Sequence, residues 1–171
     1  MIRNNKIDIY ESKLFNGTEG DFYSDIFNKK IHVEAKKLEE TYTRKCVEHY
    51  LGMSDEMINK LVKYTAEYVL ALIDDYGEDF YPDEEFDFDE TKPCGRVLDW
   101  VEPVVLSVIP DRFLSLEELT PAFRLTLRFT PIADEEIEWA VKDGEILYVG
   151  EAANVTPWEK ASFKKGWNFV E

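Results

Sequence analysis

Apolar and polar residues alternate along two stretches of the chain, and this period of two predicts strands with one buried face. Residues 31–35 have the sequence IHVEA, and residues 123–130 have the sequence FRLTLRFT. A third stretch, residues 101–109, is almost continuously apolar. Such a run is typical of a strand that is covered on both faces. Shorter extended pieces with turns at Asn16-Gly17 and Glu19-Gly20 are expected among the first thirty residues.

Two consecutive segments have the periodicity of amphipathic helices. Between residues 38 and 51 an apolar side chain recurs at every fourth position, and Gly52 follows where a helix commonly ends. A second apolar stripe runs over residues 54–76, beginning at the capping residue Ser54 and ending before Gly77. Because two residues separate the segments, we expect a helical hairpin packed on a sheet.

The stretch from residue 136 to residue 150 predicts a β-hairpin. Its centre is Asp143-Gly144, a pair that favours a two-residue type I′ turn. A regular ladder around this turn pairs Lys142 with Glu145, Val141 with Ile146, Ala140 with Leu147 and Trp139 with Tyr148. That register would place Trp139, Val141, Ile146 and Tyr148 on one common face.

A short helix is expected near the C-terminus. Thr156 and Glu159 have the spacing of a capping box, and Pro157 stands at the first helical position. Together these elements predict an α+β fold in which a mainly antiparallel sheet carries a packed helical hairpin and a short C-terminal helix. We expect residues 1–171 to form a single domain.

The net charge of the chain makes some classes of binding partner unfavourable. The chain has 36 acidic and 20 basic residues and a formal net charge of -16. A field of this sign repels phosphate backbones and anionic lipid, so we expect no direct binding to nucleic acid and none to membranes. Because the sequence has neither a signal-peptide pattern nor an apolar window of membrane-spanning length, we expect a cytoplasmic protein with free thiols at Cys46 and Cys94.

The most acidic part of the chain, residues 74–90, also contains aromatic residues. Pro82 makes a continuous helix improbable there, so we expect a surface loop. Two explanations of the aromatics stay open: they pin the loop to the core, or they anchor a basic partner that the acids steer. The interaction residues predicted by the second explanation are Phe80, Tyr81, Asp83, Glu84, Glu85, Phe86, Asp87 and Phe88.

No complete metal site is found in the sequence. Cys46 and His49 stand three positions apart and resemble half of a zinc site, but Cys94 has no neighbouring ligand. A calcium loop that began at Asp83 would have Phe88 at its sixth position, where glycine is required. We therefore expect no metal and no cofactor, although weak, adventitious binding of divalent ions stays open for the acidic segment.

Candidate catalytic residues are equally sparse. Asp134, Glu135, Glu136 and Glu138 lie beside Trp139, which is the residue set of a carboxylate pair in a carbohydrate-cleaving enzyme. In a chain this acidic, such proximity is expected by chance. The sequence contains neither a nucleophile elbow nor a phosphate-binding glycine loop. We assign no catalytic residue and keep a carboxylate-dependent hydrolase or a divalent-metal-binding enzyme as the alternative function.

One pattern in the hairpin resembles known families. It has the form E-x-x-hydrophobic-x-hydrophobic-K-D-G-x-hydrophobic-x-x-V-G and comprises Glu136, Trp139, Val141, Lys142, Asp143, Gly144, Ile146, Val149 and Gly150. Together with the preceding helix pair, it resembles bacterial families of small acidic α+β domains of unknown function. Many of these have His or Gly beside the first acid, where this chain has Ile137 and Glu138.

The resemblance implies a role in interaction and supplies no catalytic residue. Some similar small acidic proteins act as immunity or accessory proteins beside secreted toxins. The sequence thus favours a non-enzymatic, cytoplasmic protein-binding domain. Its concrete form is an immunity protein that uses an acidic surface against a basic protein partner.

Overall fold

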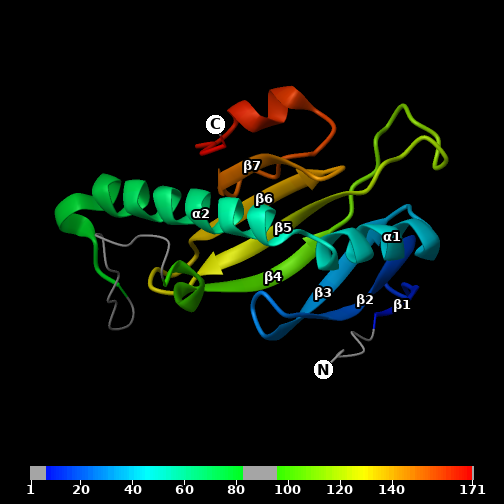
Figure 1. Ribbon diagram of the computed structural model, residues 1–171, viewed down its shortest axis with the longest axis horizontal. Helices are drawn as coiled ribbons and strands as arrows, with labels where there is room; N and C mark the ends of the chain where they lie inside the picture. The colour runs from blue at the N-terminus through cyan, green and yellow to red at the C-terminus, as the bar shows by residue number, and fades with distance from the viewer. Residues whose placement is uncertain (1–6, 83–95, 171) are drawn as a thin grey trace.

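The computed structural model describes residues 7–82 and 96–170, and in this part of the chain seven strands form one sheet in the order of the sequence (Figure 1). The strands are β1 (Asp8–Glu11), β2 (Gly17–Ser24), β3 (Lys29–Lys36), β4 (Val101–Ser107), β5 (Ala122–Phe129), β6 (Glu136–Lys142) and β7 (Glu145–Glu151). All neighbours pair antiparallel except β3 and β4, which are parallel. The predicted α+β class with a mainly antiparallel sheet is confirmed.

Two helices connect the parallel strands β3 and β4, and both pack on one face of the sheet (Figure 1). Helix α1 (Glu40–Leu51) lies against β1, β2 and β3, whereas α2 (Asp55–Tyr76) lies against β7. The Ser54 hydroxyl caps α2 by accepting a hydrogen bond from the Met57 N–H. The helix pair packs on the sheet as expected, but its members follow one another across the sheet instead of lying side by side.

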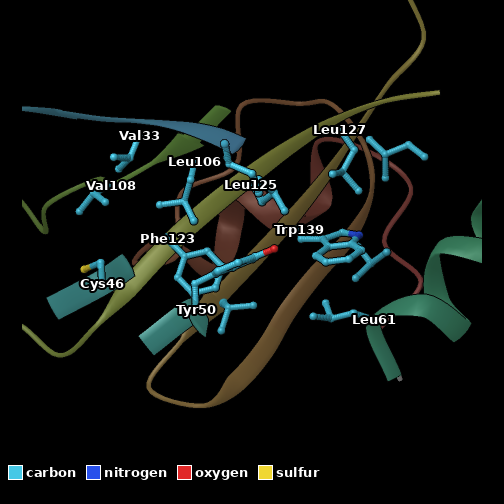
Figure 2. Close-up of a cluster of buried hydrophobic side chains, with 14 of the residues drawn as sticks. Val33, Cys46, Tyr50, Leu61, Leu106, Val108, Phe123, Leu125, Leu127 and Trp139 are labelled. Carbon is cyan, nitrogen blue, oxygen red and sulfur yellow. The ribbon is translucent and has the colours of Figure 1, made fainter. Parts of the chain in front are cut away.

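The core lies between this face of the sheet and the two helices (Figure 2). Strands β3 and β5 turn their apolar residues towards the helices, as the alternation predicted. Trp139 is fully buried beneath α2, and its indole Nε1 donates a hydrogen bond to Thr65 Oγ1 at 2.9 Å. The Thr65 hydroxyl in turn donates to the Leu61 carbonyl oxygen at 2.7 Å. The Trp139–Thr65 bond joins α2 to the sheet, and the bond within the helix orients the Thr65 hydroxyl that accepts it.

The predicted hairpin turn is present, but the predicted register is correct only next to it. Asp143 and Gly144 have φ values of 50° and 79°, as a type I′ turn requires. A β-bulge between Ala140 and Val141 then shifts the ladder, so that Ala140 pairs with Tyr148 and Trp139 pairs with Val149. Tyr148 therefore lies on the opposite face from Trp139, and the expected aromatic cross-strand pair is wrong.

A C-terminal segment, residues 152–165, covers part of this opposite face. Tyr148 and Ala140 form a second small apolar cluster there with Val155, against which Phe163 packs. The predicted C-terminal helix is a 3-10 helix of five residues, Lys160–Lys164. Because the segment covers β5 as well, Arg124 is half-buried and Thr126 is buried, so the second face of β5 is only partly wet.

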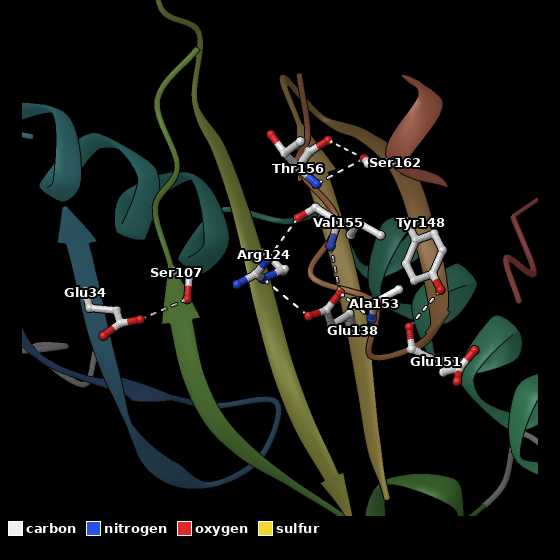
Figure 3. A network of polar contacts seen from close by, with 10 residues as sticks. All are labelled: Glu34, Ser107, Arg124, Glu138, Tyr148, Glu151, Ala153, Val155, Thr156 and Ser162. Atoms are coloured by element: carbon white, nitrogen blue, oxygen red, sulfur yellow. Dashed lines mark hydrogen bonds and ion pairs between the residues drawn. The ribbon is translucent and has the colours of Figure 1, made fainter. Parts of the chain in front are cut away.

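A buried carboxylate holds this segment on the sheet (Figure 3). Glu138 is 2% exposed, and its Oε2 accepts hydrogen bonds from the N–H groups of Ala153 and Val155 at 3.2 and 3.1 Å. Its Oε1 lies 3.4 Å from Arg124 Nε, and the same guanidinium donates to the Val155 carbonyl oxygen. A buried charge is tolerated when it is paired and hydrogen-bonded in this way.

Two other expectations for strands need correction. Glu19-Gly20 lies inside β2 and not in a turn. A Cβ atom at Gly20 would lie 1.9 Å from the Asp8 carbonyl oxygen, so glycine is required there by the close approach of β1. The middle of β4 is half-buried instead of covered on both faces, and its register shifts after Pro103, which has no N–H for the ladder.

The hydrogen bond between Trp139 and Thr65 can be tested with a double-mutant cycle. We expect Thr65→Val to lower the free energy of unfolding by about 1–3 kcal/mol, since the buried indole N–H loses its acceptor. In the Trp139→Phe background the same change should have a much smaller effect. Urea denaturation measures both values, with Thr41→Val on the exposed side of α1 as the control. Equal effects of Thr65→Val in the two backgrounds would contradict the proposed coupling.

Buried tyrosines should make the fold sensitive to alkaline pH. Burial raises the pKa of Tyr50 above the ordinary value of 10.0, and it does the same for Tyr42, Tyr68 and Tyr148. Unfolded tyrosines lose their protons near pH 10 while these stay protonated in the native state. The stability that they contribute is thus complete below pH 10 and is lost as the pH rises further.

The measurement is the urea midpoint at several values between about pH 8 and pH 11. We expect Tyr50→Phe to flatten the decline above pH 10 by up to about 1.4 kcal/mol per pH unit. The half-exposed Tyr10 provides the control substitution, Tyr10→Phe. If both variants declined as steeply as the wild type, burial of Tyr50 would not be the cause.

Candidate functional site

Acidic residues gather where α2 ends. Asp74 and Asp75 occupy the last turn of the helix, which contains no basic residue. The 3-10 helix η1 (Gly77–Asp79) follows immediately and adds Glu78 and Asp79. All four carboxylates are exposed.

The connection between β5 and β6 contributes further acids to the same place. The Tyr76 hydroxyl donates a hydrogen bond to Glu135 Oε1 at 2.6 Å and so joins the end of α2 to this connection. This bond, together with the negative charges of Glu135 and Asp75, raises the pKa of Tyr76. We call the resulting surface the acidic end, and define it by Asp74, Asp75, Glu78, Asp79, Asp134 and Glu135.

The acidic end opposes the local electrostatics of the helix. A helix C-terminus carries a partial negative charge from its unpaired carbonyl groups, so that cations stabilise it and carboxylates do not. At its N-terminus α2 has the favourable arrangement, with Asp55 and Glu56 in the first turn. At its C-terminus Asp74 and Asp75 repel both the helix dipole and each other. Positive charge brought by another molecule would relieve this repulsion.

Only two of the predicted interaction residues belong to the described part of the chain. Phe80 is half-buried, and its ring stands edge to face with the Tyr76 ring at 6.5 Å. Tyr81 is 78% exposed. Asp83, Glu84, Glu85, Phe86, Asp87 and Phe88 lie outside the described residues. The Phe80 ring therefore packs on the fold, as the first explanation requires, in which the aromatics pin the loop. The Tyr81 ring is open to contact, as the second explanation requires, in which they anchor a partner.

Sequence reasoning did not connect Asp134 and Glu135 with the acidic segment. The hydrogen bond that joins Glu135 to Tyr76 spans 59 positions of the chain. Neither Tyr76 nor Glu135 carries a local signal of this contact, because it arises from the packing of α2 on the sheet. Only the apolar stripe of α2, which ends at Tyr76, indicates which face of the helix turns inwards.

The carboxylates considered as an acid–base pair have separate structural roles. Glu135 bonds to Tyr76 on the side of α2, whereas Glu138 lies on the opposite face of the sheet. Oε2 of Glu138 accepts hydrogen bonds from the C-terminal segment, and Oε1 pairs with Arg124 of β5. Trp139 faces away from Glu138 and bonds to Thr65. In this geometry Glu138 is a structural anchor.

Cys46 and His49, which resembled half of a zinc site in the sequence, each contact other parts of the fold. Cys46 is fully buried against the sheet, and burial raises the pKa of its thiol. His49 Nε2 accepts a hydrogen bond from the Gly144 N–H at 3.0 Å and so ties α1 to the β6–β7 turn. Within residues 7–82 and 96–170, no cluster of three or more His, Cys, Asp or Glu side chains is arranged to hold a metal ion.

A groove of about 580 Å³ lies between the α1–α2 connection and the β6–β7 turn. Its wall includes His49, already bonded to the turn, and the pair formed by Lys60 and Glu56 at 2.8 Å. The His49 bond joins α1 to the turn, whereas the Lys60–Glu56 pair lies within α2. In the described part of the chain, no helix combines the length and the apolar character that crossing a membrane requires.

Comparison with known proteins adds no relative. No family model, no curated protein and no solved structure matches the chain. A function for the acidic end must therefore be inferred from its own residues and charges.

The unfavourable charge at the end of α2 is expected to lower the stability of the protein. We expect Asp75→Lys to raise the free energy of unfolding by about 0.3–1 kcal/mol at low ionic strength, because a cation suits the helix C-terminus. The gain should shrink at about 1 M salt, where exposed charges are screened. Asp55→Lys at the other end of α2 is the matched control and should destabilise the protein. Equal effects of the two substitutions in urea denaturation would contradict the electrostatic explanation.

Proposed function

We propose that this chain is a non-enzymatic, cytoplasmic protein-binding domain whose acidic end docks on a basic surface of a partner protein. Its concrete form is a bacterial immunity protein that neutralises a basic, nuclease-like toxin. The observation that carries the proposal is the gathering of carboxylates from two separate parts of the chain at the end of α2, all of them exposed except the half-buried Glu135, without basic residues in the last turn of that helix. The formal net charge of -16 supports it.

The physical basis is electrostatic steering combined with relief of repulsion. Complementary charge raises the rate of encounter between proteins and selects against partners of the wrong sign. Lysine and arginine side chains of the partner would also compensate the negative end of the α2 dipole. The exposed ring of Tyr81 supplies an anchor beside these charges, since aromatic residues are common among the side chains that dominate binding energy.

The test begins with recovery of a partner from the native cell at moderate salt, followed by calorimetry with the purified partner. The double variant Asp74→Lys/Asp75→Lys removes acids from the acidic end. Its control, Glu11→Lys/Glu145→Lys, changes the net charge equally at exposed positions of β1 and β7. We expect the first variant to weaken binding at least tenfold and the control to weaken it much less, because local charge complementarity decides specificity.

Two results would overturn the proposal. Equal weakening by both double variants would show that only the total charge matters. Failure to recover any protein partner, together with stoichiometric divalent metal in the purified protein, would favour the metal-dependent enzyme instead. Because Asp74 and Asp75 are exposed, we expect the variants to remain folded, and urea denaturation can verify this.

A further inference from the structure

The connection between β4 and β5 presents apolar side chains to solvent. It extends away from the sheet at the opposite end of the molecule from the last turn of α2 (Figure 1). Phe113 is 93% exposed, Leu114 is 40% exposed and Leu116 is 43% exposed. We call these three residues the apolar tip. Adjacent apolar side chains on an otherwise charged surface commonly mark a site of interaction.

The base of this connection is held from both sides. On one side the Tyr42 hydroxyl of α1 donates a hydrogen bond to the Thr120 carbonyl oxygen at 2.8 Å. On the other side Trp158 Nε1 donates to the Ile109 carbonyl oxygen at 2.6 Å. The side chain of Leu119 is buried in the core. The apolar tip therefore stands on a fixed stem.

The tip itself is ordered by hydrogen bonds between neighbouring residues. Asp111 Oδ1 accepts a hydrogen bond from the Phe113 N–H at 2.7 Å. The backbone N–H and the hydroxyl of Ser115 both donate to Glu118 Oε2, at 2.9 and 2.8 Å. These bonds fix the backbone on either side of Leu114. A segment that is ordered before binding loses less conformational entropy when it binds.

We propose that the apolar tip inserts into an apolar pocket with a basic rim on a partner protein. In the sequence the tip is flanked by the acidic residues Asp111, Glu117 and Glu118 and by the basic residue Arg112, while Lys45 of α1 donates to the Leu119 carbonyl oxygen at the base. The acidic charges complement a positive rim, and Phe113 supplies an aromatic anchor for the pocket. This contact is separate from the acidic end and goes beyond the proposed function.

Charge and size argue against two other binding partners for the apolar tip, a second copy of this chain and an anionic membrane. A second copy of the chain has the same net charge of -16 and is repelled. Three side chains also cover far less than the roughly 800 Å² that each partner contributes to a standard protein interface, so two tips alone would not hold a dimer. An anionic membrane is repelled by the acids beside the tip. An apolar pocket suits a small, rigid projection of this kind.

The experiment places a photo-crosslinking amino acid at the tip. p-Benzoylphenylalanine replaces Phe113 in one variant and Leu14, which is 86% exposed in the β1–β2 connection, in the control. We expect irradiation in the native cell to give an adduct with one other protein from position 113 and none from position 14. That protein, once purified, should bind Phe113→Ser/Leu116→Ser at least about tenfold more weakly than the wild type, and Leu14→Ser within about twofold.

Several outcomes would overturn the inference. They are the absence of a specific adduct, an adduct between two copies of this chain, and equal affinity of the tip variant and the wild type for the adducted protein. Sedimentation with neutral phosphatidylcholine vesicles that Phe113→Ser/Leu116→Ser abolishes would identify a lipid surface instead. If partner binding responds to Asp74→Lys/Asp75→Lys but not to the tip variant, the proposed function stands and this inference falls; the reverse result rejects only the acidic end.

Discussion

The packing of α2 over Trp139 is the constraint on which the other features of the molecule depend. An indole buried in the middle of β6 must satisfy its N–H, and Thr65 accepts that hydrogen bond. The bond sets both the rotation of α2 and its position along the sheet. With α2 in this position, Tyr76 reaches Glu135, and acids from two distant parts of the chain form one surface. The core interaction thus determines where the charge gathers.

The opposite face of the sheet depends on a polar anchor. Glu138 holds the C-terminal segment through backbone N–H groups, and Arg124 compensates its charge. A carboxylate buried in this way would be costly without both kinds of partner. The segment it holds also supplies Trp158, which fixes one side of the β4–β5 stem. Buried contacts therefore position both proposed surfaces, the acidic end and the apolar tip.

The predictions from sequence are accurate where a local pattern determines the structure. The Asp143-Gly144 turn, the Ser54 cap and the alternation in β3 and β5 need only neighbouring residues, and each appears as expected. The register of β7 could not be predicted in the same way. A bulge adds one residue without changing the composition of the strand, so the period of two gives no sign that Tyr148 turns to the second face.

Longer-range contacts explain the remaining differences. The Thr156 and Glu159 spacing suggested an α-helix, but the Ser162 hydroxyl bonds to the Thr156 and Glu159 carbonyl oxygens and closes a tighter 3-10 turn. In the candidate site, the sequence pointed to the acidic segment and to Tyr81, whose ring is exposed, whereas Phe80 is half-buried. The partnership of Asp134 and Glu135 with α2 arises from tertiary packing and has no local pattern.

The central claim is that charge gathered at the end of α2 recruits a basic protein. Stopped-flow measurement of the association rate constant, with the purified partner over a range of salt concentrations, tests it most directly. The account predicts a rate that falls steeply as salt rises, and a shallower dependence for Asp74→Lys/Asp75→Lys than for Glu11→Lys/Glu145→Lys. An association rate that is independent of salt, or the same dependence in both variants, would contradict the claim.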